Sequence, residues 1–80
     1  MTVYLCKVWD GDLGDWVDIG VFSTSAKALA SGLQYITDAC DTAQLIDWEY
    51  ESNVSTDWFH GVNGHNYTRV VTQTEIDRGL

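Results

Sequence analysis

The chain has 80 residues, of which 45% are hydrophobic, and its twelve carboxylates outnumber its four basic side chains to give a formal net charge of −8. This length predicts one domain over residues 1–80, and the hydrophobic content excludes an intrinsically disordered chain. Because phosphate binding needs clustered Lys and Arg, the charge argues against direct binding to nucleic acid or an anionic membrane. It favours a protein partner with a basic surface, unless it serves only to keep a small protein soluble.

The first elements predicted along the chain are two strands joined as a hairpin. Residues 3–9 and 16–22 are rich in β-forming side chains, and Asp and Gly crowd the turn between them. In the second strand, Val17, Ile19 and Val21 alternate and are expected to share one face.

A helix is predicted from about Thr24 to Ala39, because Ser23 and Thr24 are N-cap residue types and the hydrophobic period then changes to 3.6. Its apolar stripe is expected to comprise Leu29, Leu33, Ile36 and Cys40, with Ala26 and Ala30 beside them. Gly32 inside the helix costs about 1 kcal/mol relative to Ala, which a close approach of the helix to the sheet would explain.

Residues 45–51 alternate between apolar and acidic side chains. Ile46, Trp48 and Tyr50 are expected on one face, which predicts a half-buried strand. The opposite face would then carry a regular ridge of carboxylates, formed by Asp47, Glu49 and Glu51.

The last two strands are predicted over residues 55–62 and 65–74, on either side of Asn63-Gly64. A two-residue loop at Asn63-Gly64 would place Trp58 opposite Arg69. The same register would place His60 opposite Tyr67. The predicted fold is therefore α+β, in the order β-β-α-β-β-β, with an antiparallel sheet of four to five strands and one helix packed on one face.

The residues Val3-Tyr4, then Gly20-Val21-Phe22-Ser23-Thr24, then Lys27-Ala28 form a strand-to-helix junction. This pattern, over roughly residues 2–40, resembles one found in short uncharacterised proteins of phages and mobile elements. At Ser25-Ala26 the chain departs from it, because acidic residues usually complete a capping box there. The resemblance implies an α+β fold and a phage origin, and it implies no functional site.

No pattern in the sequence predicts a metal or cofactor site. Asp10, Asp12 and Asp15 lie in a Gly-containing loop, but Val21 stands where a calcium-binding EF-hand loop needs a bidentate Glu. Turn chemistry explains these residues instead. Cys6 and Cys40 lack zinc-site spacing. Because no secretory signal implies an oxidising compartment, they are interpreted as small buried hydrophobes and not as a disulfide.

Catalysis is not predicted either. The only histidines, His60 and His65, flank one predicted turn, so a catalytic triad would need an unsupported tertiary coincidence. No Gly-rich nucleotide motif occurs. We therefore expect no enzymatic activity and no cofactor. Because no secretory signal or membrane span is recognisable, we expect the protein in the cytoplasm, which is the host cytoplasm if a phage encodes it.

Aromatic side chains are too numerous for the single buried face of such a sheet. Trp58 and Phe59 are adjacent, so on a strand they must point to opposite faces. Exposed Trp and Tyr anchor interfaces, although large aromatics also thicken a thin core. The candidate partner-binding residues are Asp47, Glu49, Glu51, Asp57, Trp58, Asp10, Asp12 and Asp15.

The sequence therefore favours a non-enzymatic acidic protein that inhibits or modulates nucleic-acid-handling machinery by occlusion or phosphate mimicry, as in phage counter-defence against CRISPR or restriction systems. The first alternative is a structural or assembly protein that homodimerises through the uncovered sheet face. The second is an enzyme or a small-ligand-binding module. In the first interpretation the acidic ridge is functional, and in the alternatives it is an ordinary solvated strand face.

Overall fold

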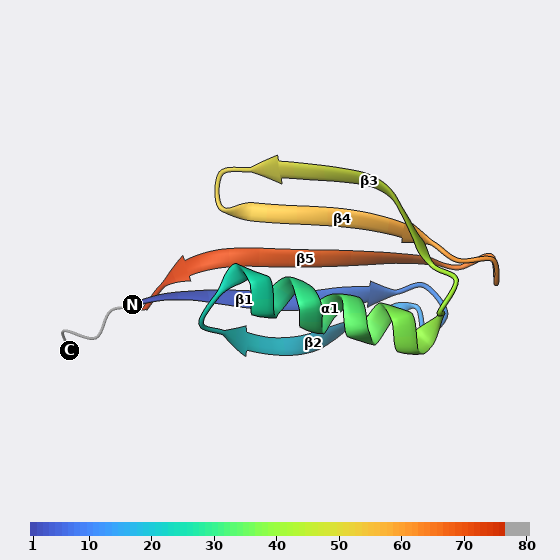
Figure 1. Cartoon of the computed structure of the whole chain (residues 1–80), viewed down its shortest axis with the longest axis horizontal. Helices are drawn as coiled ribbons and strands as arrows, with labels where there is room; N and C mark the ends of the chain where they lie inside the picture. Colours follow the sequence, from blue (N-terminus) through green and yellow to red (C-terminus); the bar gives the residue numbers. More distant parts are fainter. Residues whose placement is uncertain (77–80) are drawn as a thin grey trace.

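The structure is a computed structural model, and it describes residues 1–76. One helix packs on a five-stranded sheet whose neighbouring strands are all antiparallel, in the order β2-β1-β5-β4-β3 (Figure 1). The predicted α+β fold and its element order are confirmed. The elements are β1 (Thr2–Asp10), β2 (Asp15–Phe22), α1 (Ser25–Ala39), β3 (Gln44–Glu51), β4 (Val54–His60) and β5 (Asn66–Glu75).

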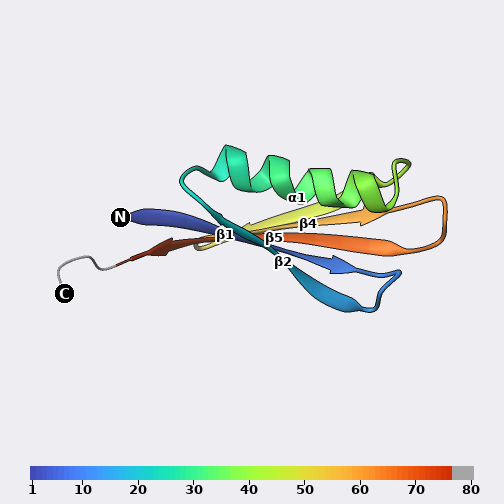
Figure 2. The same ribbon diagram turned by 90° about the horizontal axis from the view of Figure 1, so that it is seen from below.

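The helix covers only part of one face of the sheet. It contacts β1, β2 and β5, and it lies on one side of the sheet (Figure 2). β3 and β4 extend beyond the helix (Figure 1). We call the side that carries α1 the helix face and the opposite side the open face.

The helix α1 has the predicted N-cap and the predicted C-terminal end. Thr24 is the N-cap, and its Oγ1 accepts a hydrogen bond from Lys27 N at 3.2 Å. The helix ends at Ala39, where Cys40 N donates to Ile36 O at 2.8 Å. No helix in residues 1–76 is long and apolar enough to cross a membrane.

The buried stripe of α1 agrees only in part with the predicted one, since Leu29, Ile36 and Cys40 pack in the core but Leu33 does not. The fully buried positions are Ala28, Gly32 and Ile36, whereas Leu33 is 43% exposed. The reason is the close approach of helix to sheet, because a Cβ added at Gly32 would lie 2.9 Å from Cys6 Sγ. Gly32 thus has the role expected of it. Ala28, Gly32 and Ile36 are buried against the sheet, and Leu29 packs partly buried against the core.

The core lies between α1 and the strands beneath it. One cluster of buried side chains surrounds the helix C-terminal half, and a second lies under its N-terminal half. The first contains Val8, Ile36, Phe59 and Tyr67, and the second contains Cys6, Ala28 and Val71.

β2 contains a β-bulge, which places Val21 on a different face of the sheet from the one predicted. Cys6 pairs with Gly20 but Lys7 pairs with Asp18, so Ile19 is the extra residue. Ile19 packs against the core, whereas Val21 pairs with Leu5 on the open face and is 61% exposed. The expectation that Val17, Ile19 and Val21 share a face was wrong, because a bulge breaks the period of two.

The β4–β5 loop is one residue longer than predicted. Gly61 N donates to His65 O and Gly64 N donates to Gly61 O, each at 3.0 Å. These hydrogen bonds enclose residues 62–64 as a three-residue loop, and its last residue, Gly64, has φ +85°.

The longer loop shifts the β4–β5 register by one residue. Trp58 lies opposite Thr68, not Arg69. His60 lies opposite Asn66, not Tyr67.

The prediction of a half-buried β3 was also wrong. Every residue of β3 is exposed, including Ile46, Trp48 and Tyr50. The physical reason is position, because β3 is an edge strand that contacts no element except β4 in the described part of the chain. A register shift at Ile46 also separates this residue from the alternation of Trp48 and Tyr50.

Candidate protein-interaction surface

The predicted carboxylate ridge exists, and it lies on the open face of β3. Asp47, Glu49 and Glu51 are opposite Trp58, Thr56 and Val54 of β4. These three β4 residues alternate with Phe59, which is buried under the helix, so their side chains belong to the open face. We call Asp47, Glu49 and Glu51 the acidic edge. On a strand its carboxylates recur about every 6.6–6.8 Å.

No cation within residues 1–76 forms an ion pair with the acidic edge. Arg69 is held in a buried ion pair, and the N-terminal ammonium group lies 3.5 Å from Glu75 Oε2. Lys7 Nζ lies 4.4 Å from the centre of the Trp16 ring on β2, the opposite edge strand. The negative potential of the acidic edge is therefore not neutralised by the described part of the chain.

Asp57 has an internal role and does not lie on the open face. Its Oδ2 accepts hydrogen bonds from Arg69 Nη2 at 2.7 Å and Nε at 3.0 Å. Arg69 Nη1 also donates to Leu29 O at 3.0 Å, which joins the helix to the sheet. Asp57 is 8% exposed, so a partner cannot contact its carboxylate without disrupting this pair.

Asp10 is buried as well, at the end of β1. Its Oδ1 accepts from the backbone N–H groups of Asp12 and Leu13, and its Oδ2 accepts from Tyr35 Oη at 2.7 Å. Burial by itself would raise the pKa of Asp10, but these hydrogen bonds outweigh it and hold the pKa below its ordinary value. The bond to Asp10 raises the pKa of Tyr35 to about 12.

Asp12 and Asp15 are exposed but lie apart from the acidic edge in the sheet order. Asp12 lies in the β1–β2 turn and Asp15 is the first residue of β2, whereas β3 is at the other edge. Asp12 Oδ1 lies 3.3 Å from His65 Nε2, and Asp15 Oδ1 accepts from Trp16 N at 2.8 Å. Of the eight candidate residues, the structure therefore brings together Asp47, Glu49, Glu51 and Trp58.

The open face also carries aromatic side chains. Trp58 lies on it directly opposite Asp47, while Phe59 is 4% exposed in the core, as the alternation of the strand predicted. At the far side of the same face, the Trp9 and Trp16 rings meet edge to face with centroids 5.6 Å apart. An open depression of about 490 Å³ lies between β1 and β2, and residues such as Leu5 and Val21 line it.

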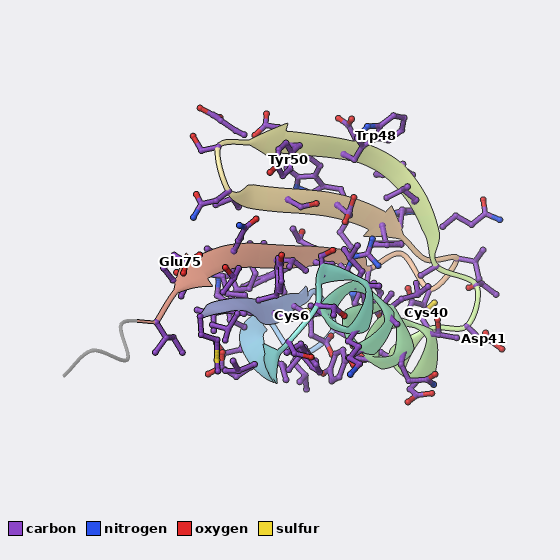
Figure 3. The ribbon with its side chains drawn as sticks, turned by 60° about the vertical axis from the view of Figure 1, so that its left-hand side comes forward. Cys6, Cys40, Asp41, Trp48, Tyr50 and Glu75 are labelled. Atoms are coloured by element: carbon purple, nitrogen blue, oxygen red, sulfur yellow. The ribbon has the colours of Figure 1, made fainter. Side chains whose placement is uncertain are left out.

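The helix face of β3 adds a second exposed group that the sequence did not predict. Trp48 and Tyr50 are each 69% exposed, and they lie on β3 away from the helix (Figure 3). Alternation alone shows that they share a face, but the burial of that face depends on how far the helix reaches. An exposed Trp and Tyr next to the acidic edge give β3 an apolar and an anionic side.

Residues 1–76 contain no group of three or more His, Cys, Asp or Glu side chains arranged to hold a metal ion. His60 Nδ1 is 2.6 Å from Asn66 Oδ1, and His65 is paired with Asp12. Burial raises the pKa of the Cys6 thiol, and a hydrogen bond with Thr42 lowers that of Cys40. His60 thus pairs across the end of the β4–β5 hairpin, and His65 joins the β4–β5 loop to the β1–β2 turn.

Comparison of the sequence with protein-family models gives no match. Comparisons with curated proteins and with solved structures give no significant match either.

Proposed function

We propose that this chain is a non-enzymatic protein-binding factor, and that the acidic edge is its binding surface for a partner with a basic surface. The observation that carries the proposal is the absence of a neutralising cation near Asp47, Glu49 and Glu51 within residues 1–76. A strand face that bears three regularly spaced carboxylates attracts Lys and Arg and repels phosphate.

The partner class follows from the same charge pattern. A basic surface large enough to engage a row of carboxylates is typical of proteins that bind nucleic acid, because phosphate binding requires clustered cations. The acidic edge would occupy such a surface in place of phosphates, and Trp58 on the same face would add an apolar contact. Inhibition by occlusion is the expected consequence, and counter-defence by a phage against a CRISPR or restriction system is the most concrete setting.

Capture of partners from a lysate of the native host tests this proposal. The native protein and the variant Asp47→Asn, Glu49→Gln, Glu51→Gln are immobilised in parallel, and retained proteins are identified by mass spectrometry. We expect the native chain to retain basic proteins that the variant does not retain. Retention of the same proteins by the native chain and by the variant would contradict the proposal. Competition by duplex DNA then shows whether the partner's basic surface is a nucleic-acid site.

A second candidate function is assembly through the open face. Leu5, Trp16 and Val21 are 40%, 44% and 61% exposed there, and a symmetric dimer would bury them. Light scattering at micromolar concentration separates the candidates. A dimer that dissociates in Trp16→Ser would favour assembly, whereas a 9.0 kDa monomer leaves the open face free for a different protein.

A further inference from the structure

The outer backbone edge of β3 is unpaired in the described part of the chain. β3 ends the strand order and pairs only with β4. Trp48 N donates to the neighbouring Asp47 Oδ1 at 2.8 Å, which shows that this N–H group points away from β4. Because main-chain groups alternate in direction along a strand, those of Tyr50 also point outward. Trp48 and Tyr50 therefore present backbone donors and acceptors that an added strand could pair with.

The other edge strand, β2, is less suited to pairing. The bulge at Ile19 interrupts its ladder, and α1 packs against it from the helix face. β3 by contrast is regular from Asp47 to Glu51, and no described element covers either of its faces. The outer edge of β3 is therefore more regular than that of β2, and an added strand can reach it more easily.

We propose that the outer edge of β3 accepts an extended segment of the partner as an additional antiparallel strand, in which Lys or Arg alternates with apolar residues. This inference rests on the proposed function, because it specifies how the basic partner engages the acidic edge. On the open face, the cations lie beside Asp47, Glu49 and Glu51. On the helix face, the apolar residues lie against Trp48 and Tyr50, which are both exposed.

Charge argues against a second copy of this chain as the added strand. Two β3 strands side by side would bring six carboxylates onto one face, and like charges on neighbouring strands are destabilising. A basic segment would instead place cations beside the carboxylates, which is stabilising. When its carbonyl replaces Asp47 Oδ1 at Trp48 N–H, the Asp47 carboxylate becomes free to contact a partner cation.

Four fluorescent peptides as long as β3 test this inference through their binding to the intact protein. The first alternates Lys and Val. The second has the same composition in two blocks, so it cannot place all its charges on one face. The third and fourth are the alternating peptide with N-methyl groups on every Val or on every Lys. In an antiparallel pair directly opposite residues share a face, so the Val backbone faces that of Trp48 and Tyr50 and the Lys backbone faces solvent.

We expect the alternating peptide to bind at least about tenfold more tightly than the block peptide, since main-chain hydrogen bonds and one-sided charge both add affinity. Methylation of Val should abolish binding, and methylation of Lys should preserve it. Equal binding of all four peptides, with loss of binding in the triple acidic-edge variant, would overturn strand addition and leave charge-based docking intact. No binding of the alternating peptide at about 1 mM would also overturn strand addition, whereas the lysate capture tests the proposed function independently.

Discussion

Arg69 and Asp57 form a buried ion pair that links β5, β4 and α1. Arg69 Nη2 lies 2.7 Å from Asp57 Oδ2, and the remaining guanidinium nitrogen Nη1 donates to the helix carbonyl of Leu29. The two side chains are only 12% and 11% exposed. The same guanidinium lies 5.3 Å from the centre of the Phe59 ring. This pair therefore holds the helix over the strands that position the open face.

Asp57→Ala should lower the free energy of unfolding by about 3–4 kcal/mol, because it leaves the Arg69 charge buried without its partner. Urea denaturation followed by tryptophan fluorescence measures this loss. The matched control is Asp12→Ala, in which an exposed carboxylate paired with His65 is removed, and we expect a change below about 1 kcal/mol there. Equal effects of the two substitutions would contradict a structural role for the Asp57–Arg69 pair.

Gly32→Ala should destabilise the protein although Ala is the better helix former. The new methyl group would lie 2.9 Å from Cys6 Sγ and from Arg69 Cδ, and Arg69 cannot move freely because Asp57 holds it. We expect a net loss of about 1–3 kcal/mol by thermal or urea unfolding. Ser31→Ala on the neighbouring position provides the control, since it adds no atom to the helix–sheet contact. A more stable Gly32→Ala variant would show that the helix can move away from the sheet.

Asp10 should contribute stability that is lost in acid. Its pKa in the folded state lies below the ordinary value of 3.8, so the folded protein binds the proton less readily than the unfolded chain. The contribution is fully present above that ordinary pKa and disappears as the pH falls through the lowered folded pKa. Asp10→Asn removes this titration and leaves one acceptor oxygen where the carboxylate uses two, one for Tyr35 Oη and one for the Asp12 and Leu13 N–H groups. We expect the variant to be less stable at pH 7 and the difference to shrink below pH 3.8, measured by urea unfolding across pH. A difference that does not depend on pH would contradict the argument.

The sequence predicted the elements that local chemistry determines. Thr24 and the change of hydrophobic period located the helix, and strand alternation placed Asp47, Glu49 and Glu51 on one face. It did not predict the β4–β5 register, because Asn63-Gly64 suits both a two-residue and a three-residue loop. The two-residue loop would need positive φ at both Asn63 and Gly64, whereas only Gly64 has it here.

Tertiary contacts decided the remaining differences. The burial of Asp57 follows from its pairing with Arg69, which the one-residue shift in register created. The exposure of Trp48 and Tyr50 follows from the reach of α1 over β1, β2 and β5, which no pattern within β3 encodes. The candidate site was therefore predicted as a row of carboxylates, but its edge position and its apolar second side were not.

The most direct test of the acidic edge measures the affinity of a captured partner for the native chain and for Asp47→Asn, Glu49→Gln, Glu51→Gln, at about 50 and 200 mM salt. All three residues are exposed and outside the core, so circular dichroism should show an intact fold in the variant. We expect the native affinity to fall steeply with salt, and the variant to bind about 30-fold more weakly at low salt with little salt dependence. A partner affinity that is unchanged by both salt and the triple substitution would contradict the role of the acidic edge in binding.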